Sequence, residues 1–251
     1  MSQDTPLLAR QIQLLRHLTD AELIFGEGRR QAEARQPSFD NLSSPHLRLE
    51  AEMSFAKRMA NIDKVFRRTA RCAGKQWSVI CREFAAACRP RSGRRTEEAL
   101  RLYEFLQHHW AAVRPTPPFI ADVAKLEITI AKVAASDRSS EVVDASTARS
   151  PKTQGETYVR RIRRAEIVRL QYDLRGLFQS NGSNISAPEA NENYLLVAQA
   201  TGTKRPAIIS ISSPEYAFLD QVRDWISVER VAREIDTLEK FRAAGIVELY
   251  Q

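Results

Sequence analysis

Apolar residues recur at helical spacing through the first half of the chain, with Arg, Lys and Gln between them. This pattern predicts helices over residues 6–24, 46–71, 76–88, 96–113 and 119–135. The stripe of the second helix consists of Leu49, Met53, Ala56, Met59, Ile62 and Phe66. We therefore expect a helical domain over residues 1–135.

The period changes beyond this domain. Residues 136–157 are rich in Ser, Thr, Asp and Lys without periodicity, which predicts a linker. In residues 166–174 apolar and polar positions alternate, as in a half-buried strand. Residues 194–200 and 206–212 are further strand candidates, joined by a hairpin turn.

Helical spacing returns after the third strand. Ser213 as N-cap, followed by Pro214 and Glu215, predicts a helix start. A second helix covers Val228 to Ile235 and continues toward Gly245. We expect an α+β fold in which residues 158–251 form a module with a small antiparallel sheet. A short sheet beside such helices resembles a winged helix, and peptide-recognising modules have the same plan, so the resemblance implies a winged-helix-like, peptide-recognising module.

The composition excludes several protein classes. The hydrophobic fraction of 43% is typical of a globular chain, and no apolar run is long enough to span a membrane. The N-terminal residues lack the plan of a signal peptide, so we expect a cytoplasmic protein. Three cysteines are too few for a disulfide framework, and Cys81 and Cys88 share one helix face, as small core residues do.

Recognisable catalytic motifs are missing from the sequence. The four histidines lack metal-site spacing, and no phosphate-binding loop, nucleophile elbow or Cys-His pair stands out. Glu97 and Glu98 are explained as charges at a helix start. We expect no catalytic residue, no metal and no cofactor in this chain.

The net charge of +7 indicates an acidic partner or simply a solvated, Arg-rich surface. Arginines cluster at residues 89–95 and 160–164. They could contact phosphate or carboxylate groups, or protect a sheet edge. A winged-helix DNA-binding regulator is the alternative function. Against it, the presumed recognition helix mixes Glu229 and Glu234 with Arg230 and Arg233.

A strand followed by helices leaves a sheet edge to which an extended peptide can add through main-chain hydrogen bonds. The third strand and the helix around Val228 to Ile235 could form such a site, although the edge could equally face water or the helical half. The candidate peptide-binding residues are Ile208, Ile209, Ser210, Ile211, Val231 and Ile235.

The segment from Phe105 to Trp110, followed by residues 117–127, carries a family resemblance. In it a Pro-hydrophobic turn, Pro117 and Pro118, precedes an Asp-x-Ala-x-x-Glu helix that begins with Asp122. It resembles the HvfC-like partner proteins of multinuclear non-haem iron enzymes in peptide-natural-product biosynthesis. Partner subunits of methanobactin and 3-thiaglutamate biosynthesis are similar. Helices followed by a peptide-recognising module fit this plan.

The resemblance implies a non-catalytic subunit in a heterodimer. Its partner would be a TIM-barrel enzyme whose two or three irons and dioxygen modify a cysteine of a ribosomally made precursor peptide. This chain would capture that peptide, and the iron would belong to the partner. The motif positions assigned to the partner interface are Pro117, Pro118, Asp122 and Glu127, although Asp122 and Glu127 could equally be structural. An enzyme whose site leaves no motif is a third possibility.

Overall fold

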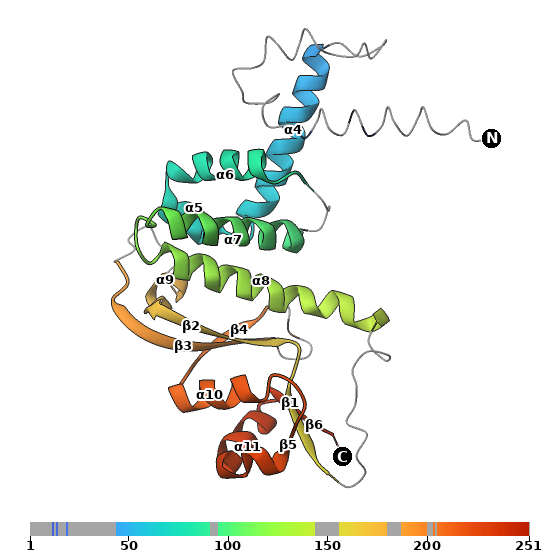
Figure 1. The fold of residues 1–251 in the computed structure, drawn as a ribbon, viewed down its shortest axis with the longest axis vertical. Helices are drawn as coiled ribbons and strands as arrows, with labels where there is room; N and C mark the ends of the chain where they lie inside the picture. Colours follow the sequence, from blue (N-terminus) through green and yellow to red (C-terminus); the bar gives the residue numbers. More distant parts are fainter. Residues whose placement is uncertain are drawn as a thin grey trace, which may run out of the picture. The chain divides into compact units, whose positions relative to one another are not determined.

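The computed structural model describes residues 44–90, 95–143, 156–179, 187–199 and 205–250, with positions 12, 14, 19 and 203. The predicted helix over 6–24 lies largely outside these residues, as do Arg91 and Arg94. The described part is α+β, with eight α-helices and two three-stranded antiparallel sheets (Figure 1). Helices occupy the N-terminal part and the strands follow, as predicted.

The chain divides into two compact units, Met1–Pro117 and Pro118–Gln251. The first unit is helical, with α4 (Ser44–Asp63), α5 (Arg67–Ala73), α6 (Gln76–Ala87) and α7 (Arg95–Ala112). The pattern over 46–71 predicted one helix where two occur. Phe66 leaves helical geometry with φ −96° and ψ 41°, yet both Ile62 and Phe66 stay buried, so their spacing does not reveal the break.

Two residues of the predicted apolar stripe are not part of the core of this unit. Leu49 and Met53 on α4 are 54% and 58% exposed, whereas Met59 and Ile62 further along the helix are buried. The C-cap of α5 is Gly74 with φ +55°, as its position after the apolar stripe predicted.

A buried ion-pair network crosses the first unit. The Glu98 carboxylate accepts from Arg58 Nε at 2.8 Å and from Arg101 Nη1 at 3.0 Å. The Arg58 guanidinium also donates to the Cys88 carbonyl oxygen and lies 4.6 Å from the centre of the Phe84 ring. Glu98 is therefore a structural anchor between α4 and α7, beyond the helix-start charge that its position predicted.

The second unit contains all the strands among the described residues. Its elements are α8 (Ile120–Val143), β1 (Tyr158–Arg161), β2 (Ala165–Tyr172), α9 (Arg175–Gln179), β3 (Ala190–Ala198), β4 (Ala207–Ile211), α10 (Ser213–Gln221), β5 (Ile226–Ser227), the 3-10 helix η1 (Val228–Glu234), α11 (Ile235–Ala243) and β6 (Val247–Tyr250). The strand orders are β5-β1-β6 and β2-β3-β4. Strands β2, β3 and β4 correspond to the three strands predicted over residues 166–174, 194–200 and 206–212.

The boundary between the units differs from the predicted linker. Helix α8 packs against β2 and β3, so it belongs with the sheet and not with the helical unit. It also continues to Val143, into the segment 136–157 that its composition marked as linker. An apolar helix stripe shows that a helix is buried but not against which neighbour, which is why α8 was assigned to the first domain.

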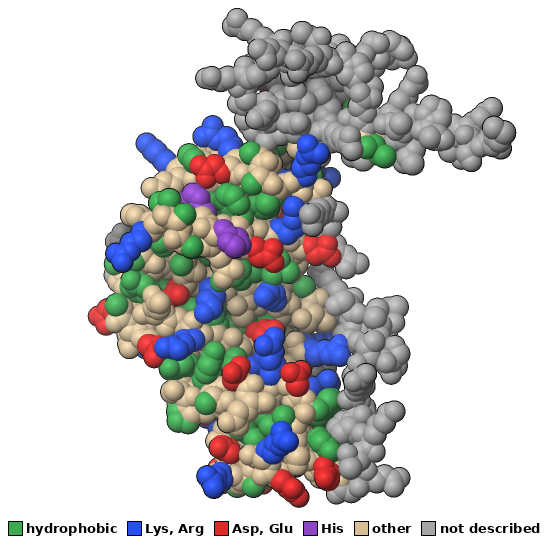
Figure 2. Space-filling view, in the orientation of Figure 1, with side chains coloured by type: hydrophobic (Ala, Val, Ile, Leu, Met, Phe, Trp, Pro, Cys, Tyr) green, Lys and Arg blue, Asp and Glu red, His purple; other side chains and the backbone are tan. Residues whose placement is uncertain are grey.

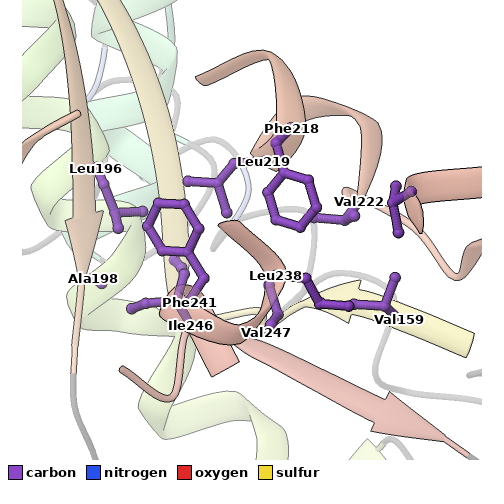
Figure 3. Packing of buried hydrophobic residues seen from close by; sticks show 12 residues of the cluster. Val159, Leu196, Ala198, Phe218, Leu219, Val222, Leu238, Phe241, Ile246 and Val247 are labelled. Atoms are coloured by element: carbon purple, nitrogen blue, oxygen red, sulfur yellow. The ribbon is translucent and has the colours of Figure 1, made fainter. Parts of the chain in front are cut away.

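One hydrophobic core joins the two sheets of the second unit (Figure 3). Leu196 and Ala198 of β3 meet Phe218, Leu219 and Val222 from α10 and its C-cap. On the other side lie Leu238 and Phe241 of α11, with Val159, Ile246 and Val247. The rings of Phe218 and Phe241 stack with centroids 6.1 Å apart. Helix α10 therefore covers one face of the β2-β3-β4 sheet.

Candidate peptide-binding edge

Strand β4 lies at one end of the β2-β3-β4 sheet and pairs only with β3 among the described residues. Its register places Leu196 opposite Ile209 and Val197 opposite Ile208. We call the outer side of β4 the open edge. Residues 207–211 contain neither charge nor proline, two features that natural sheets use to prevent edge pairing.

The direction of the β4 backbone groups follows from one hydrogen bond. Gln199 N donates to Arg164 O at 3.0 Å, so the backbone groups of Gln199 point toward β2. Successive residues of a strand direct these groups to opposite sides, so those of Ala198 point toward β4. Ala198 pairs with Ala207. Ala207, Ile209 and Ile211 therefore bond to β3, whereas the N–H and C=O groups of Ile208 and Ser210 point outward.

The side chains of the open edge lie on both faces of the sheet. Directly opposed residues share a face, so Ile209 and Ile211 lie with Leu196 and Tyr194 on the face that α10 covers. Ile208 and Ser210 lie on the other face. Ile208 is 39% and Ile209 44% exposed, while Ile211 packs against the core. One accessible isoleucine thus lies on each face beside the outward backbone groups.

Two of the predicted peptide-binding residues lie elsewhere. Val231 is 0% exposed and belongs to the core, so its side chain cannot line a surface groove as predicted. Its backbone departs from helical geometry within η1, with φ −112° and ψ 17°. Ile235 is exposed at the start of α11, but the helix that follows β4 and packs on this sheet is α10. The prediction that β4 and the helix around Val231 form one groove assumed that this helix is continuous.

The C-terminal end of β4 is held by a capping box. Ser212 is the N-cap of α10: Glu215 N donates to its hydroxyl, and Ser212 N donates to Glu215 Oε2 at 2.7 Å. Lys240 of α11 forms an ion pair with the same carboxylate. The N-cap is one residue earlier than predicted, because Glu215 lies three residues after Ser212 and not after Ser213.

At the opposite edge of the sheet, the outer side of β2, two residues from the first turns of α8 reach the strand backbone. Asp122 Oδ2 accepts from Tyr172 N at 3.0 Å and from Gln171 N, at the point where a bulge shifts the β2-β3 register. Lys125 Nζ donates to Arg169 O at 2.8 Å. By the alternation derived above, the backbone groups of Ala165, Ile167, Arg169 and Gln171 point outward, and at the register shift the N–H of Tyr172 does so as well. We call this the capped edge.

Burial changes the acidity of the Asp122 carboxyl. It raises the pKa of the Asp122 carboxyl above its usual value, although the two backbone donors and Lys125 oppose the shift. The rings of Phe119 and Tyr172 lie edge to face beside it, with centroids 6.2 Å apart. Asp122 and Lys125 thus satisfy main-chain groups that would otherwise form an edge for pairing.

The other residues assigned to the partner interface differ in exposure. Pro118 is exposed and Pro117 partly buried, so both are accessible at the surface. Glu127 is only 5% exposed. Of the four, Pro117 and Pro118 therefore present the most accessible surface, whereas the Asp122 carboxylate is engaged within the second unit.

The second arginine cluster is largely engaged within the chain. Arg160 forms an ion pair with Glu248, and its guanidinium lies 4.4 Å from the centre of the Trp225 ring. Arg161 is buried and donates to Leu219 O at 3.1 Å, and desolvation lowers its pKa. Figure 2 shows Lys and Arg interspersed with Asp and Glu on the face in view. These arginines do not provide a row of accessible donors.

Two observations concern metal ligands and nucleophiles among the described residues. They contain no group of three or more His, Cys, Asp or Glu residues placed to hold a metal ion. Burial, with a contribution from Asp63, raises the pKa of the Cys81 thiol to about 12, which makes it a poor nucleophile. No helix in the described part is long and apolar enough to cross a membrane.

Sequence reasoning missed Lys125 and the direction of the β4 backbone groups. Lys125 occurs in the same segment as Asp122, three residues later, so both lie on one helix face. That spacing could have indicated that both side chains bond to the same neighbouring strand, β2. No side-chain pattern reports the backbone direction, which depends on the pairing of β3 with β2.

Comparison of the chain with protein-family models and with curated proteins found no match.

Proposed function

We propose that this chain is a peptide-binding subunit that accepts an extended segment of another polypeptide as a fourth strand beside β4. One observation carries the proposal: the open edge presents outward backbone groups at Ile208 and Ser210. At the capped edge, by contrast, Asp122 accepts from Gln171 N and Tyr172 N, and Lys125 donates to Arg169 O. Backbone pairing supplies affinity in such complexes, and neighbouring side chains supply specificity.

The resemblance to HvfC-like partner proteins suggests the biological setting. In this proposal the bound polypeptide is a ribosomally made precursor whose cysteine is modified by a multinuclear non-haem iron enzyme, with which this chain forms a heterodimer. The chain itself is non-catalytic, and the turn at the partly buried Pro117 and the exposed Pro118 belongs to the enzyme interface. The C-terminal part acts as a winged-helix-like module, in which α10 and α11 pack over β1, β3 and β6 around one core.

DNA binding is the less favoured function. It requires accessible cationic donors, and within the 160–164 cluster Arg160 is paired with Glu248 while Arg161 is buried. The helix from Val228 to Ile235 is in fact a 3-10 segment followed by the start of α11. It therefore lacks the continuous surface of a recognition helix.

The test is photo-crosslinking in the native host. A photoreactive residue replaces Ile209 at the open edge, and a matched control carries it at Val79, an equally exposed apolar position on α6. We expect a polypeptide adduct specific to position 209, identified by mass spectrometry as a cysteine-containing peptide. An iron-bearing enzyme should co-purify with both variants. Identical adducts at both positions, or none at 209, would contradict the proposal.

A further inference from the structure

The chemistry of the open edge restricts which polypeptide can occupy it. From the geometry we infer that β4 selects an uncharged, aliphatic segment of about five residues, comparable to the length of β4. Its main-chain hydrogen bonds are made to Ile208 and Ser210. This inference rests on the proposed function and specifies the ligand of the same site.

The hydrogen-bonding requirement follows from the direction of the backbone. In an added antiparallel strand, the residues opposite Ile208 and Ser210 exchange N–H and C=O bonds with them, while the intervening residues point away. Ala207, Ile209 and Ile211 direct their groups to β3 and contribute nothing to the new ladder. The bound segment therefore needs its own N–H groups at two positions, so a proline at either position prevents pairing.

The side-chain requirement follows from the exposed isoleucines. A residue opposite Ile208 lies beside its side chain on one face, and a residue opposite Ile209 lies beside that side chain on the other face. Ile208 and Ile209 are exposed by 39% and 44%, so apolar neighbours on both faces remove apolar surface from water. A charged side chain at either position loses its hydration without gaining a partner, because residues 207–211 carry no charge.

Proline substitutions can remove the outward N–H groups of the open edge without breaking the hydrogen bonds between β4 and β3. Ile208→Pro and Ser210→Pro each remove an outward N–H, which no described residue accepts, and edge strands tolerate proline at such positions. Ile209→Pro is the matched control, since it removes an N–H that points into the sheet. We expect the first two variants to keep the wild-type unfolding temperature within about 3 °C, and the third to lower it clearly.

The binding probes are two synthetic peptides of about seven residues. One has adjacent Val residues at its centre and Thr on either side, so that a Val lies on each face of the sheet, and the other has one of these Val residues replaced by Glu. Binding to the full-length chain is measured by isothermal titration calorimetry. We expect the Val-Thr peptide to bind, the Glu peptide to bind about tenfold or more weakly, and both Ile208→Pro and Ser210→Pro to weaken binding by about tenfold or more.

The outcomes distinguish the two proposals. Equal binding of both peptides, abolished by Ile208→Pro, would overturn the aliphatic selectivity and leave the peptide-binding function in place. Binding that neither proline variant weakens would overturn the open edge as the site. Failure of the Val-Thr peptide to bind at all overturns the inferred ligand class. Self-association that Ile208→Pro abolishes would show the occupant to be a second copy of this chain.

Discussion

The two outer strands of the β2-β3-β4 sheet differ in whether their outward main-chain groups have hydrogen-bond partners within the chain. Both present main-chain groups on the side away from β3. At β2, Asp122 and Lys125 of α8 satisfy three main-chain groups, those of Gln171 N, Tyr172 N and Arg169 O. At β4 the groups of Ile208 and Ser210 face outward beside two exposed isoleucines. Unprotected edges promote unwanted pairing, and natural sheets usually guard them. In this sheet the β2 edge is contacted by Asp122 and Lys125, whereas the β4 edge is apolar and uncharged. This difference supports the proposal that the β4 edge binds another polypeptide.

Amide hydrogen exchange provides the largest contrast between the edges. The Gln171 amide donates to Asp122, so its exchange requires an opening of the structure, whereas the outward amides of Ile208 and Ser210 need none. We expect the last two to exchange within about tenfold of an unfolded peptide and Gln171 to exchange far more slowly. Residue-resolved NMR is the measurement. A protected Ser210 amide in the purified chain would mean that the open edge is already paired.

Removing the cap should destabilise the second unit. Asp122→Ala leaves the N–H groups of Gln171 and Tyr172 without an acceptor, at a cost of about 1–3 kcal/mol in the free energy of unfolding. Urea denaturation measures this change. Lys125→Met is the control on the same helix, and we expect it to cost at most about 1 kcal/mol, because its bond is solvent-exposed. An equal loss for both variants would show that the carboxylate has no special role.

The pH dependence gives a smaller and more specific signal. Because burial raises the pKa of Asp122 in the folded chain, the folded state holds its proton to higher pH than the unfolded state does. The associated stability is complete at pH values below the unfolded pKa, about 3.9, and is lost as the pH rises through the folded pKa. We expect the stability of the wild type relative to Asp122→Asn to fall from about pH 4 toward neutrality. A constant difference between the two would contradict this assignment.

The hydrophobic pattern predicted the elements of the second unit well and their neighbours poorly. Alternation in residues 166–174 predicted β2, because one face of that strand is buried and the other is not. The same kind of signal could not show that α8 packs on β2. The contacts responsible join residues 49 and 50 positions apart, and Asp122 has the same sequence context whether it meets a partner protein or the backbone of Gln171.

Only some residues of the candidate site were predicted correctly from the sequence. Ile208 and Ile209 were identified because an uncharged β-branched run predicts a strand, and the structure places that strand at an edge. Val231 was wrong as a surface residue because helical spacing does not distinguish a 3-10 segment from an α-helix, and its side chain is buried in the core. The ion pairs of Glu98 could not be predicted either. The sequence shows the charge of Glu98, but only the fold shows that Arg58 and Arg101 are its partners.

The capping box at the end of β4 has a consequence for the entropy of binding. Ser212 and Glu215 fix the point where the strand becomes α10, and Lys240 ties that point to α11. Five residue pairs with β3 fix the rest of the strand. In the proposed complex, therefore, the backbone of β4 is fixed before a ligand arrives, and most of the ordering on binding falls on the incoming segment. Preorganisation of this kind lets a short segment bind with few contacts, because one of the two partners has no conformational freedom left to lose.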